Sequence, residues 1–191
     1  MGLDIHLITN NHEELFSLQN AYSHTDYFNQ HSLSRTFCNL MSRKNVISGE
    51  TELDQISRMI KTDITVLYDM EQYWDEEYID YRLMVAENEK EKQVVFEQIA
   101  ANKEKLNGNI DLVLETIKTM IEKLSKFCNL SEKLNSHGND TLDYEYYFTD
   151  FDLDKGEGYI GNNFGQDLRN FRKFLEYAKA NGANTVWFNY G

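Results

Sequence analysis

Apolar side chains recur at helical spacing through the middle of the chain, and this pattern constrains the fold more than any other feature. One face of residues 75–106 carries Tyr78, Tyr81, Val85, Val95, Ile99 and Leu106. Beyond residue 109 the period resumes with Ile110, Val113, Leu114, Ile117, Ile121, Leu124 and Cys128. Gly108 suits the left-handed end of a helix, and so short a connection lets the second helix run back beside the first. We therefore expect a long antiparallel helical hairpin over about residues 75–134.

The sequence contains no proline, the residue that most often breaks a helix. This absence agrees with long, uninterrupted helices, and codon usage in an AT-rich genome explains it equally well. Shorter stretches of helical periodicity at residues 12–22, 32–43 and 166–180 predict further helices. Another begins after Thr51, a residue suited to capping a helix N-terminus.

Three segments alternate apolar and polar residues with a period of two, which is typical of a half-buried strand. They are residues 3–7, 142–149 and 185–190. Strands at both ends of the sequence and one before the last helix predict a small sheet packed against a helical body. The expected fold class is therefore α+β, helix-dominant, in a single domain over residues 1–191.

The overall charge excludes several classes of partner. With 32 acidic and 19 basic residues the net charge is -13, which opposes binding to nucleic acid and to anionic membranes because both need a basic face. No apolar run approaches the roughly 18 residues needed to cross a bilayer. The first residues lack signal-peptide character, and Cys38 and Cys128 do not form a disulfide framework. We expect a cytoplasmic protein with both thiols buried.

The negative charge is concentrated in two windows. Residues 69–92 contain nine acids and three bases, and residues 140–158 contain seven acids and one base. The same windows hold six of the twelve tyrosines. Aromatic anchors among carboxylates are typical of a surface that binds a basic partner protein, and a solvated helix face is the alternative interpretation. The candidate partner-binding residues are Tyr73, Trp74, Glu76, Glu77, Tyr78, Asp80, Tyr144, Glu145, Tyr146 and Tyr147.

Two groups of residues are candidates for metal ligands. The first is Asp150, Asp152, Asp154 and Glu157, whose clustered carboxylates suit a hard cation such as calcium. Compared with an EF-hand loop, Lys155 and Gly161 replace the required glycine and glutamate, so only a weak divalent-cation site is expected.

The second group lies near the start of the sequence and consists of Asp4, His6, His24 and His31. The Asp-x-His fragment resembles the opening motif of metallophosphoesterases, whose later motifs are absent. Zinc or iron would need three or four such ligands to converge.

A glycine motif, G-x-G-x-x-G, spans residues 156–161. It resembles a dinucleotide-binding loop, but the neighbouring carboxylates would repel phosphate, and turn glycines explain it better. No cofactor is therefore expected beyond a weakly bound divalent cation.

Two functions follow from these patterns. The leading hypothesis is a non-catalytic interaction protein of the inhibitor, immunity or adaptor type, which binds a basic protein through its acidic, tyrosine-rich surface. The alternative is a metal-dependent hydrolase that uses one of the two carboxylate and histidine groups. The helical hairpin could in addition hold two copies of the chain together.

Overall fold

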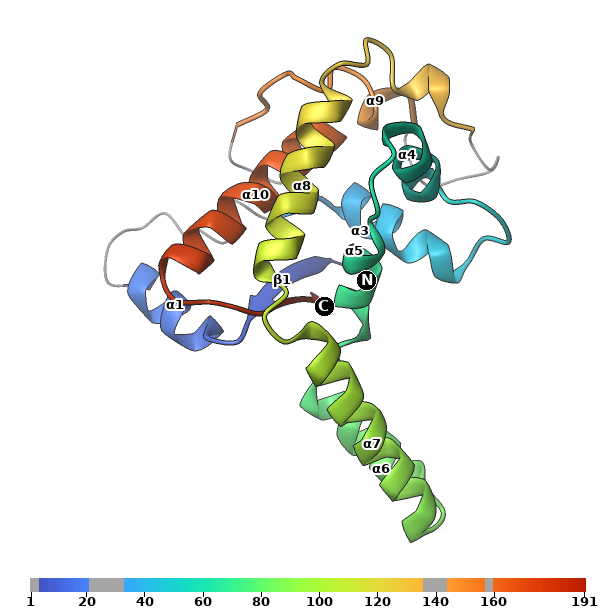
Figure 1. Ribbon diagram of the computed structural model, residues 1–191, viewed down its shortest axis with the longest axis vertical. Coiled ribbons are helices and arrows are strands. Elements are labelled where there is room, and N and C mark those ends of the chain that lie inside the picture. The colour runs from blue at the N-terminus through green and yellow to red at the C-terminus, as the bar shows by residue number, and fades with distance from the viewer. Residues whose placement is uncertain (1–3, 21–32, 136–143, 157–159) are drawn as a thin grey trace.

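The computed structural model describes residues 4–20, 33–135, 144–156 and 160–191, and its fold is helix-dominant α+β (Figure 1). Strand β1 (Ile5–Thr9) pairs antiparallel with β2 (Val186–Tyr190), in a register that places Leu7 opposite Phe188. This two-stranded sheet brings the first and last described segments side by side. The helix-dominant α+β class and the two terminal strands are confirmed.

Between the strands the described residues form helices joined by shorter connections. In order, the elements are α1 (His12–Asn20), α3 (Arg35–Ser42), η1 (Arg43–Asn45), α4 (Glu52–Ile60), α5 (Thr65–Asp69), η2 (Met70–Gln72), α6 (Glu76–Val85), α7 (Glu89–Leu106), α8 (Ile110–Leu124), η3 (Ser131–Lys133), α9 (Tyr144–Tyr147) and α10 (Phe164–Ala180).

Several helices begin where a side chain satisfies free backbone N–H groups. Ser34 accepts a hydrogen bond from the backbone N–H of Phe37 at the start of α3. Thr51 and Asp54 form a reciprocal capping box at the start of α4, as the sequence indicated for Thr51. These local contacts fix the helix starts before any tertiary packing is considered.

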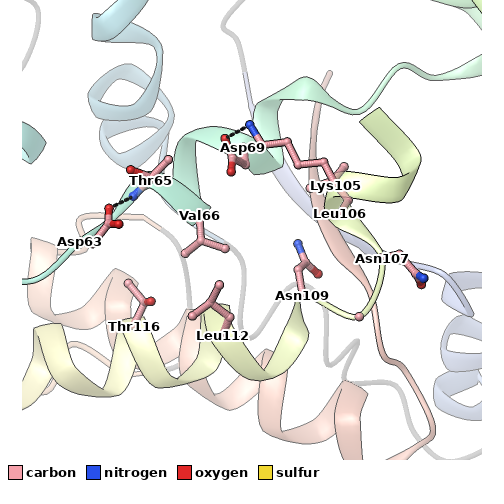
Figure 2. A pocket seen from close by; sticks show the side chains of 11 residues that line it. Asp63, Thr65, Val66, Asp69, Lys105, Leu106, Asn107, Asn109, Leu112 and Thr116 are labelled. Atoms are coloured by element: carbon pink, nitrogen blue, oxygen red, sulfur yellow. Dashed lines mark hydrogen bonds and ion pairs between the residues drawn. The ribbon is translucent and has the colours of Figure 1, made fainter. Parts of the chain in front are cut away.

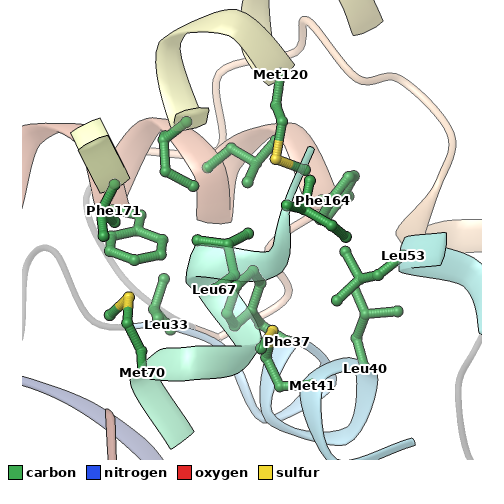
Figure 3. Packing of buried hydrophobic residues seen from close by; sticks show 14 of the residues in the cluster. Leu33, Phe37, Leu40, Met41, Leu53, Leu67, Met70, Met120, Phe164 and Phe171 are labelled. Atoms are coloured by element: carbon green, nitrogen blue, oxygen red, sulfur yellow. The ribbon is translucent and has the colours of Figure 1, made fainter. Parts of the chain in front are cut away.

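One buried apolar cluster joins the sheet to the helices around it (Figure 3). Phe37 of α3, Phe171 of α10 and Phe188 of β2 meet with ring centroids 5.7–6.3 Å apart. Helix α8 packs along α10, and Met120 of α8 points into the same cluster. No residue from 71 to 109 belongs to this cluster, although the structure describes all of them.

The helical hairpin exists, but its two helices are α6 and α7. Figure 1 shows these two helices side by side, projecting away from the rest of the molecule, whereas α8 runs into the body. Asn88 caps α7 by accepting from the backbone N–H of Glu91, so the chain turns back there, well before residue 107. We call residues 76–106 the arm.

The predicted pairing of residues 75–106 with residues 110–134 is wrong for a physical reason. At the connection, Gly108 adopts a left-handed backbone with φ of 73°. The Asn109 side chain then bonds to both the N–H and the carbonyl of Val186 in β2, each at 2.8 Å. These bonds direct the following helix into the body. Helix α8 therefore packs on α10 and does not run back beside α7.

The strand predicted at residues 142–149 is also absent where the structure describes that segment. Tyr144–Tyr147 is the short helix α9, and residues 142 and 143 lie outside the described residues. Tyr147 and Phe148 are adjacent in sequence and both buried, and Phe148 contacts Phe164 at 5.4 Å. A helical turn puts neighbouring aromatic rings into one core, which a strand with one solvated face does not do.

Candidate interaction surface

The arm is held to the body at both of its ends. Tyr73, just before α6, stacks on Trp187 of β2 with ring centroids 4.0 Å apart. At the other end the Lys105 ammonium lies 2.7 Å from the Asp69 carboxylate, and Leu106 is buried. The base of the arm is therefore fixed on the body by an aromatic stack, an ion pair and a buried leucine.

A groove of about 440 Å³ lies beside this base, between α5 and the start of α8. Figure 2 shows Lys105 reaching Asp69 above the groove, while Leu112 and Thr116 of α8 line its floor. Hydrogen bonds from the Thr65 hydroxyl and from the Thr65 backbone N–H hold the pKa of the Asp63 carboxyl below its usual value. The charged groups of this groove, Lys105, Asp69 and Asp63, therefore already have partners within the chain.

Helix α6 carries apolar side chains on two of its faces. Ile79 and Leu83 are half-buried four residues apart and share one face of α6, and we assign this face to the contact with α7. On α7, Val95 is buried and lies on the side of the helix that faces α6. This inner contact holds the two helices of the arm together.

The second face of α6 is open to solvent. Tyr78, Tyr81, Met84 and Val85 recur at helical spacing on it, and we call these four residues the outer seam. Tyr81 is 54% exposed and Met84 is 75% exposed. The sequence pattern predicted Tyr78, Tyr81 and Val85 on one apolar face of a helix, and the structure leaves this face uncovered. A helix with two apolar faces does not reveal which of them a neighbour covers.

Aromatic contacts hold the outer seam in a defined conformation. The Trp74 ring packs edge-on against Tyr78 at 5.2 Å, and Tyr78 lies 6.5 Å from Tyr81. The Arg82 guanidinium sits 4.9 Å from the Trp74 ring and donates to the Tyr78 hydroxyl. Because these rings brace one another, little side-chain freedom remains to be lost on binding.

Carboxylates border the outer seam. Helix α6 and its cap contain four acids and one base, and the base is Arg82, which lies on the aromatic rings. Within the part of the chain that the structure describes, Glu76, Glu77 and Asp80 form no ion pair and are exposed. Burial and the nearby Glu76 and Asp75 carboxylates raise the pKa of Tyr73. The seam is thus an apolar strip in a negative field.

Helix α7 exposes further apolar residues that sequence reasoning missed. Val94 and Phe96 are both exposed on either side of the buried Val95. Their signal in the sequence is the run of three apolar residues at 94–96, since a helix with one neighbour can bury only part of such a run.

The predicted partner-binding residues are divided between two distant places. Trp74, Glu76, Glu77, Tyr78 and Asp80 belong to the arm and its base. Helix α9 lies at the opposite end of the molecule (Figure 1). The acidic windows therefore do not form a single surface.

At α9 the neighbouring tyrosines differ sharply. Tyr146 is 74% exposed, whereas Tyr147 is only 2% exposed and belongs to the core. Tyr147 is thus ruled out as a contact for a partner. The side chains of Tyr144 and Glu145 lie outside the described residues.

Tyr147 is held by a buried carboxylate that the sequence did not single out. Asp167 accepts hydrogen bonds from the Tyr147 hydroxyl, the Asn162 amide, and both the hydroxyl and backbone N–H of Ser34, at 2.6–3.0 Å. Burial raises the pKa of Asp167 to about 6, against the lowering effect of its donors. The network joins α3, α9 and α10, because its four donor groups come from three separate segments of the chain.

The acidic loop at residues 150–156 binds the guanidinium group of Arg169. Arg169 of α10 donates hydrogen bonds to the carbonyl oxygens of Phe151 at 2.8 Å and Leu153 at 2.7 Å. Burial lowers the pKa of Arg169, and Asp154 and Asp152 act in the opposite direction. The guanidinium therefore supplies positive charge to this loop.

No three histidine, cysteine, aspartate or glutamate side chains converge as a metal site within the described residues. This covers Asp150, Asp152 and Asp154, whereas Glu157 lies outside the described residues. A cation site completed by Glu157 stays a prediction.

The structure describes two of the four N-terminal candidates, Asp4 and His6. Asp4 pairs with Arg35 at 2.8 Å, and this hydrogen bond lowers the pKa of the Asp4 carboxyl. His6 is exposed on β1, and both His24 and His31 lie outside the described residues. A metal site built from these four residues also stays a prediction.

The two cysteines differ in environment. Cys38 is buried in the core, and burial raises the pKa of its thiol to about 11. Cys128 is exposed, so the expectation that both thiols are buried is wrong for this residue.

Comparison with protein-family models, with curated proteins and with solved structures finds no match to this chain. In the described part of the chain, no helix combines the length and the apolar character needed to span a membrane.

Proposed function

We propose that this protein is a non-catalytic, cytoplasmic interaction protein of the inhibitor, immunity or adaptor type, which binds a basic partner protein through its arm. The observation that carries the proposal is the outer seam, where large apolar side chains remain exposed on a helix that contributes nothing to the core. Exposing such a strip to water is costly, and a contiguous apolar patch with a charged border is typical of a binding site.

The chemistry of the seam indicates the kind of partner. Tyrosines supply large contact areas with little side-chain freedom to lose, and they are frequent among the residues that dominate binding energy. Carboxylates at the border attract a basic surface and speed its approach. At about 100° per residue, Glu77 and Asp80 lie beside Met84 on α6, so a single partner surface can contact them together with the seam.

Co-purification from the native cell tests this function with a matched pair of variants. Tyr81→Ser alters the outer seam, and Tyr146→Ser makes the same change at a more exposed tyrosine at the opposite end of the molecule. We expect wild type and Tyr146→Ser to recover the same basic protein, and Tyr81→Ser to recover at least about tenfold less. Recovery should also fall with added salt, which screens the carboxylates.

Equal recovery by all three proteins would contradict the proposal, as would recovery that is unaffected by salt. Neither tyrosine is buried, so the two variants are expected to fold as wild type does. Thermal unfolding of each purified variant checks that expectation.

A further inference from the structure

We infer that the outer seam is a template for a third helix, and that the partner docks on it a short, amphipathic helix with a basic border. This inference rests on the proposed function and adds the binding mode. The arm would then become a bundle of three helices, two from this chain and one from the partner.

The spacing of the outer seam points to a helical partner. Tyr78, Tyr81 and Val85 follow one another at intervals of three and four residues, which is the spacing of the contact positions in a coiled coil. Met84 widens the strip beside Val85. An extended peptide would instead need an open sheet edge for its backbone, and α6 satisfies its own backbone internally.

The inner face of the arm shows how the third helix would fit. Ile79 and Leu83 already pack against α7 with the same intervals, so α6 lies at the centre of a bundle that lacks one member. Knobs on one helix entering holes on its neighbour give this geometry a fixed register. α6 has ten residues and rises about 15 Å, which matches two to three turns of a partner helix.

Charge decides between a foreign helix and a second copy of this chain. Glu77 and Asp80, which lie beside Met84 on α6, form no ion pair among the described residues, and two copies facing each other across the seam would bring four such carboxylates together. Like charges at a helix interface oppose association. A helix with Lys or Arg beside its apolar row would instead pair with them.

Synthetic peptides of about two heptads test this binding mode. The first has Leu at the contact positions and Lys at the flanking positions. The second has the same composition with the Leu residues moved out of register, and the third has Glu in place of Lys. Fluorescence anisotropy measures the binding of each to the full chain, and circular dichroism measures helix formation by the peptide on binding.

The inference predicts that the in-register Lys peptide binds to wild type and to Tyr146→Ser and gains helix on binding. Its affinity for Tyr81→Ser should be at least about tenfold lower, because a central anchor of the seam is lost. The out-of-register and Glu peptides should each bind wild type at least about tenfold more weakly than the in-register Lys peptide.

Two results would overturn the inference. Equal binding of the in-register and out-of-register Lys peptides would mean that the arm recognises charge without a helical register. The proposed function would survive that outcome as long as Tyr81→Ser still loses the native partner. A wild-type dimer in sedimentation that becomes a monomer in Tyr81→Ser would assign the seam to a second copy.

Discussion

Asp167 is the residue whose environment most shapes the interior. Its carboxylate collects four hydrogen bonds from three separate segments of the chain, and its side chain is fully buried. A buried carboxylate with this many donors ties elements together, whereas a donor left without an acceptor in the interior destabilises the fold.

Replacing Asp167 by alanine removes the acceptor for Ser34, Tyr147 and Asn162 together. We expect the Asp167→Ala variant to lose about 3 kcal/mol or more of unfolding free energy, since buried donors remain unsatisfied. Urea denaturation measures the change, and Asp152→Ala on the exposed loop serves as the control with little expected effect. An Asp167→Ala variant as stable as that control would contradict the structural role.

The raised pKa of Asp167 also predicts the pH dependence of stability. Its folded pKa of about 6 lies above the value near 4 of an unfolded aspartate, so folding takes up a proton between these two values. The contribution of Asp167 to stability should therefore grow as the pH falls from about 7 to about 5. The difference in unfolding free energy between wild type and Asp167→Ala, measured at both pH values, should be larger at the lower one. A difference in unfolding free energy that becomes smaller at the lower pH would contradict this prediction.

At the scale of elements, the sequence predicted helix positions better than helix partners. Thr51 acts at close range and starts a helix as predicted, whereas Asn88 starts α7 within the single helix predicted over residues 75–106. Periodicity shows which face of a helix is apolar and leaves open which neighbour covers it. The bonds of Asn109 to Val186, between residues 77 positions apart, decided the path of α8, and no local pattern contains them.

The candidate site was predictable to a similar degree. In the first acidic window Tyr78 and the neighbouring carboxylates are exposed and Trp74 is half-buried, because charged runs remain solvated. Their role in binding a partner stays a prediction. The second window led to Tyr147, which is buried. The alternation over residues 142–149 predicted a strand with Tyr147 on its polar face, whereas the short helix α9 places Tyr147 in the core.

The arm should be separable from the body. No residue from 71 to 109 enters the core cluster, so replacing residues 76–105 with a short Gly/Ser linker leaves that cluster complete. We expect the shortened protein to unfold cooperatively within a few degrees of the wild-type Tm, with the loss of the Lys105–Asp69 ion pair as a small cost. Calorimetry measures this, and a protein that no longer unfolds cooperatively would show that the arm supports the body.

At the scale of the molecule, pairing of β1 with β2 joins the two ends of the described chain. Phe188 of β2 contacts Phe37 and Phe171, so the last strand completes a core built from earlier segments. The architecture is therefore a body closed by its own terminal strands, with one arm extending from it (Figure 1). The net charge of -13 did not reveal this arrangement, which places one acidic window on the arm and the other at the far end of the body.

Truncating Phe188 tests the closure of the body. Phe188→Ala removes a buried ring from between two others, and we expect a loss of about 3–5 kcal/mol in unfolding free energy. Tyr146→Ala removes an exposed ring and should cost less than about 0.5 kcal/mol. Chemical denaturation compares the two, and similar losses would mean that β2 does not complete the core.

The central claim is that the arm is the surface where a partner binds, and photo-crosslinking in the native cell tests it most directly. A photoreactive phenylalanine derivative at Met84 reports on the outer seam, and the same group at Val46, which is 77% exposed on the body, is the control. The account predicts a crosslink to a basic protein from position 84 and none from position 46. A crosslink from position 46 alone, or equal crosslinks from both positions, would contradict it.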